Sequence, residues 1–212
     1  MLWLESVCNN ASNFFRPHEH KRTPINSIGQ GSDMSLQVGD VAPEFNLRNA
    51  NTAFGNEQQS LSDSMAKNGC VVVFECNHCP YVIASIDRMN NMAEYCNVNG
   101  IGFVGINSND PDNYPVDSFE NMVKRADKGM PYAYLHDSTQ EVATAWGAQR
   151  TPEFFLLDAN GVVTYHGRMD DSPRDPTKVT TSELKDAIDA MLAGSTPGVQ
   201  STDSIGCSVK WK

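Results

Sequence analysis

Apolar residues follow two patterns along the chain downstream of Val38. Largely apolar runs at 70–75 and 101–106 are long enough for strands that are buried on both faces of a sheet. Elsewhere apolar residues recur every three or four positions, which is typical of helices with one buried face. Strands that alternate with helices in this way indicate an α/β domain. The predicted helices cover 80–97, 116–128 and about 181–193.

Shorter signals complete the predicted order of elements. Apolar stretches on either side of Asp158-Ala-Asn-Gly161 predict an antiparallel hairpin. Gly147 would stop another short helix, capped by Asp137 or Ser138. The predicted fold class is therefore α/β, with a central, mainly parallel sheet, helices on both faces and a closing antiparallel hairpin. The remaining predicted pieces are an edge strand at 42–47, a turn at 49–59, a helical turn capped by Ser60 or Ser62, an apolar piece at 132–135, and hairpin strands at 153–157 and 162–166.

The two ends of the chain lack this periodicity. Residues 1–35 mix polar, Pro and Gly residues and are predicted to form a disordered extension ahead of a domain over 36–194. Glu5 interrupts the apolar start, so the extension does not fit a secretory signal, and a cytoplasmic location is predicted. The extension still leaves organellar targeting open. Residues 195–212 form a tail whose apolar and aromatic end predicts that it docks on the domain.

Composition and charge limit the classes of partner that the protein can bind. Of the 212 residues, 16 are Lys or Arg and 26 are Asp or Glu, which gives a net charge of −10. The chain has no basic cluster of the kind that binds nucleic acid. Its longest apolar run is too short to cross a bilayer. We therefore expect a soluble protein that binds neither nucleic acid nor membranes.

Cysteines are few and unevenly spread. They are too sparse for a disulfide-braced secreted domain of this size. One pair with a CxxC spacing and scattered single cysteines suits a reducing compartment, where the pair carries out chemistry. The six are Cys8, Cys70, Cys76, Cys79, Cys96 and Cys207.

The CxxC motif lies where the predicted strand 70–75 gives way to a helix. Pro80 follows at once and fits the first turn of that helix. The free N–H groups and the dipole of a helix start favour an anion such as the thiolate of Cys76. CxxC thiols in such places have pKa values of roughly 3.5–7.5, and the intervening Asn77 and His78 would tune the value.

Two other interpretations of the motif compete with redox chemistry. The cysteines could form half of a zinc site, or be two inert core residues. A structural zinc site usually has four ligands, and the chain holds no second CxxC and no HxxxH. We therefore predict a redox pair, with no metal and no cofactor.

Four segments together resemble a known family. They are CNHCPYV, GINSNDPDNYP, TPEFFLLDANG and the terminal GCSVKWK. The chain is similar, over about residues 36–212, to thioredoxin-fold redoxins of the AhpC/TSA group, in particular to the peroxiredoxin-like branch that carries CxxC. This resemblance implies a thioredoxin fold, with Cys76 as nucleophile, Cys79 as resolving partner and Pro152 as a cis-proline beside them. It also implies that the backbone at Thr151 pairs with a bound substrate chain.

Two departures from the family pattern stand out. Glu75 places a negative charge directly before the nucleophile, which alone would raise the pKa of that thiol. Arg150 would offset this effect if its side chain faces Glu75 across the cysteine pair. A pair of unrelated, solvated side chains is the alternative. Thioredoxins proper also carry a buried Asp about six residues before the nucleophile. Cys70 stands there, so the base that deprotonates Cys79 is unassigned.

Other polar and sulfur-containing positions receive simpler interpretations. The docked tail could bring Cys207 to the site as a third redox thiol, against the alternative of simple packing. Cys70 and Cys96 are expected to be small core residues. The acidic loop 109–117 and Asp170-Asp171 are expected to be solvated surface loops, because no ligand spacing stands out.

The predicted function is that of a thiol–disulfide oxidoreductase. Its partners would be a disulfide-containing protein or a small thiol or hydroperoxide substrate, together with an external thiol reductant. One alternative is a peroxiredoxin-like peroxidase with an antioxidant role. Peroxiredoxins use PxxxTxxC for that chemistry, and Gly69 and Val73 stand here in place of the Pro and Thr. The other alternative is a non-catalytic redox sensor or binding module.

Overall fold

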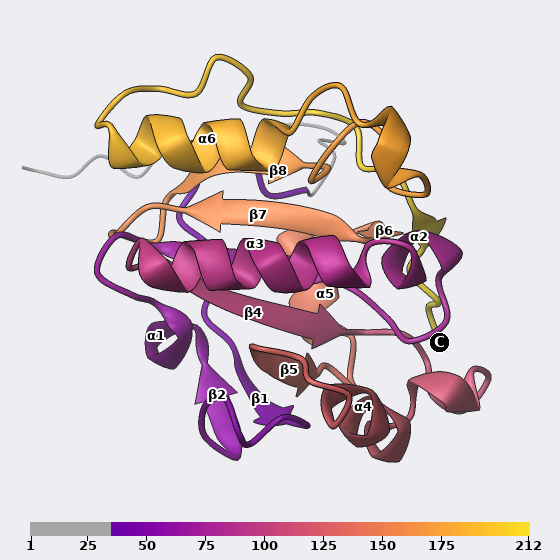
Figure 1. Cartoon of the computed structure of the whole chain (residues 1–212). Coiled ribbons are helices and arrows are strands. Elements are labelled where there is room, and N and C mark those ends of the chain that lie inside the picture. The colour runs from indigo at the N-terminus through magenta and orange to yellow at the C-terminus, as the bar shows by residue number, and fades with distance from the viewer. Residues whose placement is uncertain (1–34) are drawn as a thin grey trace, which may run out of the picture. The chain divides into compact units, whose positions relative to one another are not determined.

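The computed structural model describes residues 35–212. The predicted disordered extension therefore lies, but for its last residue, outside the described residues. The described part is built on a seven-stranded sheet with the order β2-β1-β5-β4-β3-β7-β8 (Figure 1). Its strands are β1 (Asn46–Asn49), β2 (Gln58–Ser60), β3 (Cys70–Phe74), β4 (Gly102–Asn107), β5 (Ala133–His136), β7 (Glu153–Leu157) and β8 (Val163–Gly167).

The sheet combines a parallel centre with antiparallel edges. Strands β3, β4 and β5 run parallel to one another, while β7 pairs antiparallel with both β3 and β8. The predicted closing hairpin is thus confirmed. The other edge carries a second antiparallel hairpin, β1–β2, in a stretch for which the sequence predicted only an edge strand and a turn.

Helices cover both faces of the sheet. Figure 1 shows α3 (Ile86–Val98) and α6 (Glu183–Leu192) in front of it and α5 (Glu141–Trp146) behind it. Successive side chains of a strand point to opposite faces. In β3, Val71 and Val73 accordingly pack with the front helices, whereas Val72 and Phe74 pack with Trp146 of α5. A strand buried on both faces explains the continuous apolar run.

Several predicted helices are divided. The stretch 80–97 forms α2 (Pro80–Ile83) and α3, separated by a buried Ser85 whose hydroxyl donates to the Pro173 carbonyl at 3.0 Å. The stretch 116–128 begins with the 3₁₀ turn η1 (Pro115–Asp117) before α4 (Phe119–Ala126). The remaining helical pieces are α1 (Leu61–Ser64), which Ser60 caps, and η2 (Pro176–Lys178).

A second, two-stranded sheet joins the tail to the domain. β6 (Arg150–Thr151) pairs antiparallel with β9 (Cys207–Ser208), and Thr151 lies opposite Cys207. The sequence pattern contained no strand signal for either segment. This pairing brings the last residues of the chain to the loop that precedes β7.

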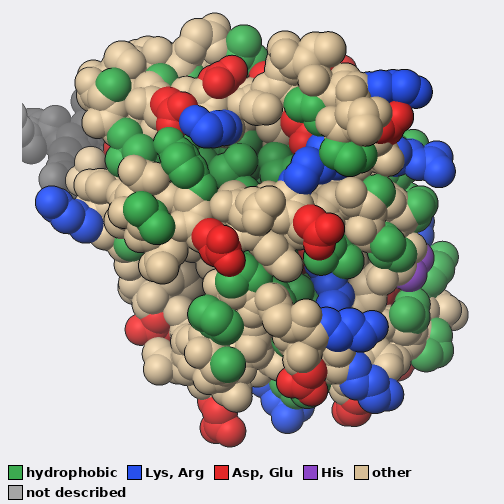
Figure 2. Space-filling model, viewed as in Figure 1, with side chains coloured by type: hydrophobic (Ala, Val, Ile, Leu, Met, Phe, Trp, Pro, Cys, Tyr) green, Lys and Arg blue, Asp and Glu red, His purple; other side chains and the backbone are tan. Residues whose placement is uncertain are grey.

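Two surface properties bear on function. Within residues 35–212 no helix has the length and apolar character needed to cross a membrane. Figure 2 shows an apolar hollow between α3 and α6, with a volume of about 430 Å³. Met92, Tyr95 and Met169 contribute to its lining, and the CxxC cysteines do not. The chemistry predicted from the sequence therefore lies elsewhere, at the carboxyl end of β3.

Candidate active site

The CxxC motif occupies the connection between β3 and α2. Cys76 lies two residues after the end of β3, and Cys79 is the N-cap residue of α2, directly before Pro80. Residue exposure is 1% for Cys76 and 0% for Cys79. The five cysteines within the described residues are all unpaired, so the site is seen in its dithiol form.

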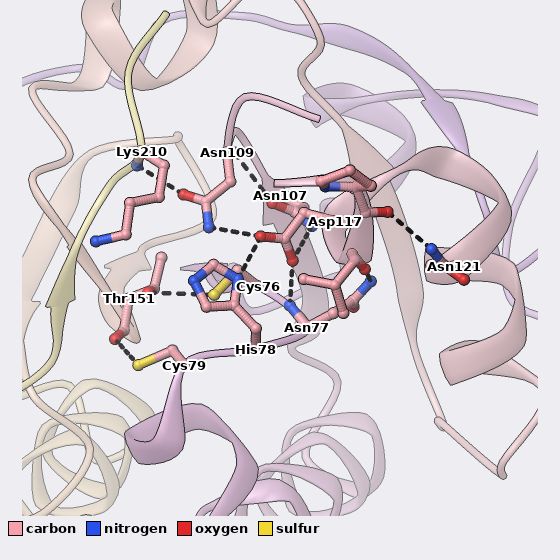
Figure 3. A network of polar contacts seen from close by, with 12 residues as sticks. Cys76, Asn77, His78, Cys79, Asn107, Asn109, Asp117, Asn121, Thr151 and Lys210 are labelled. Atoms are coloured by element: carbon pink, nitrogen blue, oxygen red, sulfur yellow. Dashed lines mark hydrogen bonds and ion pairs between the residues drawn. The ribbon is translucent and has the colours of Figure 1, made fainter. Parts of the chain in front are cut away.

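The sulfur atoms of Cys76 and Cys79 both lie against Thr151. The Cys79 sulfur lies 3.0 Å from the Thr151 carbonyl oxygen, and the Cys76 sulfur lies 3.5 Å from the Thr151 hydroxyl (Figure 3). The peptide bond between Thr151 and Pro152 is cis, which confirms the expectation from the resemblance. Thr151 and Pro152 therefore form the wall that faces the motif.

The contact between the two motif thiols shifts their pKa values in opposite directions. The hydrogen bond from Cys76 lowers the pKa of Cys79 to about 4, with further donation from Cys207 and from the Val82 backbone N–H in α2. The same hydrogen bond raises the pKa of Cys76, as do burial and the nearby Asp117 carboxylate. The sequence analysis predicted a lowered pKa for Cys76. With the tail docked, the pKa of Cys79 is the one that is lowered, because Cys79 receives more donors.

Glu75 forms an ion pair, but not with Arg150. Its buried carboxylate contacts the guanidinium of Arg125 in α4 and accepts a hydrogen bond from Tyr132 Oη at 2.9 Å. Burial alone would lower the pKa of Arg125, but the Glu75 charge, the neighbouring Tyr134 and Tyr132, and the hydrogen bond to Glu75 together raise that pKa. Arg150 is exposed and donates instead to the Gly206 carbonyl at 3.2 Å. The predicted Glu75–Arg150 pair is therefore wrong, because Glu75 points into the domain and Arg150 points toward the tail.

The Glu75–Arg125 pair also supports the motif. Arg125 Nη1 donates to the Cys76 carbonyl at 2.8 Å, and Tyr134 Oη donates to Asn77 Oδ1 at 3.0 Å. Gly105 in β4 leaves the space that the carboxylate needs, because a Cβ there would overlap Glu75 Oε1. The negative charge that acts on Cys76 is consequently that of Asp117.

Asp117 is the centre of a polar network that the sequence did not predict (Figure 3). It is fully buried and accepts hydrogen bonds from the Asn77 backbone N–H at 2.6 Å and from Asn109 Nδ2 at 2.9 Å. Asn107 Nδ2 lies 3.4 Å from the same carboxylate. The interpretation of loop 109–117 as a solvated surface loop is therefore wrong for Asp110 and Asp117, which are buried, although residues 112–116 between them are exposed. The buried carboxylate is bonded to Asn77 and His78 and so fixes the CxxC connection.

His78 extends this network toward the surface. Its Nδ1 lies 2.6 Å from Asp117 Oδ2, and its ring stacks on Tyr114 with the ring centroids 5.4 Å apart. The side chain is 27% exposed. Because Asp117 fixes Nδ1, the second ring nitrogen of His78 is free of hydrogen bonds to the described residues.

The same three side chains are the nearest approach to a metal site in the described residues. One ligand atom each from Cys76, His78 and Asp117 lie within 4.8 Å of one another. Both oxygens of Asp117 already accept N–H groups, and His78 Nδ1 is bonded to one of them. The arrangement is a closed hydrogen-bond network, and three donors fall short of the four that a structural zinc site uses.

The other acidic pair is also partly buried. Asp170 is buried and forms an ion pair with Arg88 of α3, whereas Asp171 is bonded to Thr180. The expectation of a solvated loop is therefore wrong for Asp170, whose partner comes from a distant helix. Cys70 and Cys96 are buried core residues as expected, and burial raises the pKa of Cys96 to about 12.

Cys207 lies beside the dithiol. It is partly exposed and packs against the core cluster that contains Cys76 and Cys79, and its thiol and backbone N–H help to lower the pKa of Cys79. Burial, and next the neighbouring Cys79, raise the pKa of Cys207. The structure thus gathers three cysteines around Thr151, two from the motif and one from the tail.

Fold and site together define a thioredoxin-like protein, in which a central strand leads through a CxxC dithiol into a helix and a cis-proline faces the sulfur atoms. The chain belongs to the Redoxin family, whose family model matches residues 37–188. A comparison with curated proteins gave no match.

Solved structures resemble the chain over most of its length. An uncharacterised conserved protein from Geobacillus kaustophilus is 40% identical over 84% of this chain and 93% of its own, with a TM-score of 0.78. Hypothetical protein SMc02350 from Sinorhizobium meliloti 1021 is 36% identical over 84% of this chain and 96% of its own, with a TM-score of 0.74. A candidate thiol:disulfide interchange protein DsbE from Chlorobium tepidum, at 20% identity, 76% and 98% coverage and a TM-score of 0.53, shares the fold.

Proposed function

We propose that this chain is a thiol–disulfide oxidoreductase whose Cys76 and Cys79 cycle between dithiol and disulfide. The observation that carries the proposal is the meeting of both sulfur atoms at Thr151, beside cis-Pro152. Two thiols held side by side provide a nucleophile and a resolving group in contact, which is what disulfide exchange requires.

The reaction takes two exchange steps. The proton of Cys76 moves along the hydrogen bond to Cys79, and the Cys76 thiolate attacks one sulfur of a substrate disulfide. The substrate S–S bond breaks, and its other sulfur leaves as a thiolate that takes up a proton. Cys79 then loses its proton and attacks the Cys76 sulfur, which releases the second substrate thiol. Two electrons pass to the substrate and leave a Cys76–Cys79 disulfide, which an external thiol reductant must reduce.

Neighbouring groups favour this division of roles. Asp117 raises the pKa of Cys76, and a thiolate of high pKa is intrinsically the stronger nucleophile once it is formed. The network around Asp117 fixes the backbone of Asn77 and the ring of His78. His78 is therefore positioned to supply a proton to the departing substrate thiolate.

The surface around the motif suits a protein substrate. Ile83 on α2 is 53% exposed, and Val116, whose carbonyl binds Asn77, is 46% exposed. Tyr114 stacks on His78 and is also exposed. Exposed apolar side chains grouped around one site mark a contact surface for another protein. The proposed substrate is therefore a protein disulfide.

The peroxidase alternative has less support. In the position of the peroxiredoxin Pro, a Cβ at Gly69 would overlap the Leu157 carbonyl oxygen. In the position of the Thr, Val73 packs into the core beneath α3 and α6. A peroxide site built from those two positions is therefore not available to Cys76.

Parallel assays test the proposed function. We expect the full chain to catalyse the reduction of insulin by a dithiol, with activity lost in Cys76→Ser and retained in the matched variant Cys96→Ala, whose sulfur lies in the core. Peroxide consumption with the same samples would favour the peroxidase. Activity in neither assay, together with a reversible conformational change on oxidation, would favour the sensor.

A further inference from the structure

The chain's own tail occupies the place beside cis-Pro152 where a substrate strand is expected. The backbone of Thr151, in β6, pairs with Cys207 of β9. Both thiols of the motif lie against the same threonine. A third thiol therefore reaches the dithiol along the route that a substrate disulfide would use.

Contacts on both sides of Cys207 hold the tail in place. Gly206 crosses directly over the Thr151 carbonyl, where a Cβ would overlap the oxygen. Val209 is buried, and its N–H donates to the Gln149 carbonyl at 2.9 Å. The position of Cys207 is therefore fixed by its neighbours on both sides and does not depend on the thiol itself.

The loops at the carboxyl edge of the sheet hold the next residue of the tail. The Lys210 backbone N–H donates to Asn109 Oδ1 at 2.8 Å (Figure 3), and its carbonyl accepts from the Asp110 N–H at 2.8 Å. The side chain of Gln140 donates to the same carbonyl at 2.8 Å and accepts from the Lys212 N–H at 2.9 Å. Gln140 has a positive φ of 64°, which is uncommon for a residue other than glycine and places its side chain over the tail.

We propose that Cys207 is a third redox residue, which takes over the disulfide from the CxxC pair. This proposal rests on the proposed function. The Cys207 thiolate attacks the Cys79 sulfur of the Cys76–Cys79 disulfide. A Cys79–Cys207 bond forms, the Cys76–Cys79 bond breaks, and its electron pair passes to Cys76, which takes up the proton that Cys207 lost. The number of disulfides is unchanged, and Cys76 is free again.

Charge and exposure favour this transfer once the pair is oxidised. The Cys79 charge helps to hold the pKa of Cys207 above its ordinary value in the dithiol form, and that contribution vanishes when Cys79 enters a disulfide. Of the three sulfur residues, Cys207 is the one with appreciable exposure. A thiol of the external reductant would attack the Cys207 sulfur and expel the Cys79 thiolate. A second thiol of the reductant would then release Cys207, so that the reductant supplies two electrons and becomes a disulfide.

Disulfide mapping of the full chain tests the proposal. The dithiol protein is treated with oxidised glutathione, quenched in acid, alkylated and digested. We expect both a Cys76–Cys79 and a Cys79–Cys207 peptide, the latter at no less than about one tenth of the former, which corresponds to 1.4 kcal/mol. The Cys76→Ser variant supplies the reference Cys79–Cys207 peptide, because Cys79 has lost its partner within the motif. Cys207 then competes with glutathione for Cys79 at an effective concentration of about 1 mM or more.

A matched variant controls for tail docking. In Cys207→Ser/Ser208→Cys the thiol moves to the opposite side of β9, so that no bridge to Cys79 should form. A wild-type map that contains the Cys76–Cys79 bridge alone refutes the proposal that Cys207 is a third redox residue and leaves the proposed function intact. A map with neither bridge refutes the proposed function itself.

Discussion

Replacing Arg125 with Met removes the cation that faces the buried carboxylate of Glu75. The carboxylate is fully buried and Arg125 is only 11% exposed, so water cannot replace the lost partner. Removal of one partner from a buried ion pair costs about 3–5 kcal/mol. The whole stability of a typical domain is only about 5–15 kcal/mol, so the loss should be large.

Urea unfolding of the dithiol form measures this loss. At a slope of about 2 kcal/mol/M, we expect the midpoint of Arg125→Met to fall by about 1.5–2.5 M. Arg150→Met is the matched control, since Arg150 is exposed and makes its hydrogen bond to the tail. It should cost less than about 1 kcal/mol.

The double variant Glu75→Gln/Arg125→Met completes the cycle. Because the uncompensated charge is gone and the glutamine can still accept from Tyr132, the double variant should be more stable than Arg125→Met alone. It also provides a folded sample if Arg125→Met does not fold. The reasoning would be refuted if Arg150→Met lost as much stability as Arg125→Met, or if the double variant gained nothing.

Three further predictions follow from the site and the tail. Gly206→Ala should lift the tail from Thr151 and speed the alkylation of the motif thiols several-fold, and unchanged rates measured by mass spectrometry would contradict the close approach. Asp117→Asn should lower the unfolding free energy in urea by about 2–3 kcal/mol, because two N–H groups lose a charged acceptor; a loss within experimental error would contradict the network. The unfolding free energy of the dithiol form, relative to that of Cys79→Ser, should rise from about pH 4 to about pH 8.5, because in this range Cys79 holds a proton in the unfolded chain that it has lost in the folded one. A difference in unfolding free energy that does not vary with pH would contradict the lowered pKa of Cys79.

Local sequence signals predicted the centre of the site. The apolar run 70–74, the CxxC and Pro80 lie next to one another in the chain, and each has its effect within one turn of a helix. The closing hairpin was predicted for the same reason, since a Gly-containing turn joins two adjacent apolar stretches.

The partners of these local elements could not be predicted in the same way. Arg125 lies 50 residues from Glu75, and its position on a predicted helix gave no sign that it faced the motif. The pairing of β6 with β9 joins two dipeptides, which are too short to show a period. Contacts of this kind depend on how the sheet brings its loops together.

Asp117 is the one missed residue for which a signal existed. It follows a polar loop at the carboxyl end of a buried strand, where loops gather around ligands in α/β sheets. Its acidic neighbours suggested a solvated surface instead. The buried carboxylate shows that polar residues at that edge of the sheet should be considered as parts of the site even when they show no metal-ligand spacing.

Trapping of the mixed disulfide tests the central claim most directly. In the full-length variant Cys79→Ser/Cys207→Ser, both groups that could resolve the intermediate are removed, while Cys76 and the cis-Pro152 wall remain. After mixing with insulin, a covalent complex should accumulate that thiols release, and peptide mapping should place the bond on Cys76. A complex formed through any other cysteine, or no complex under conditions in which the wild type reduces insulin, would contradict the account.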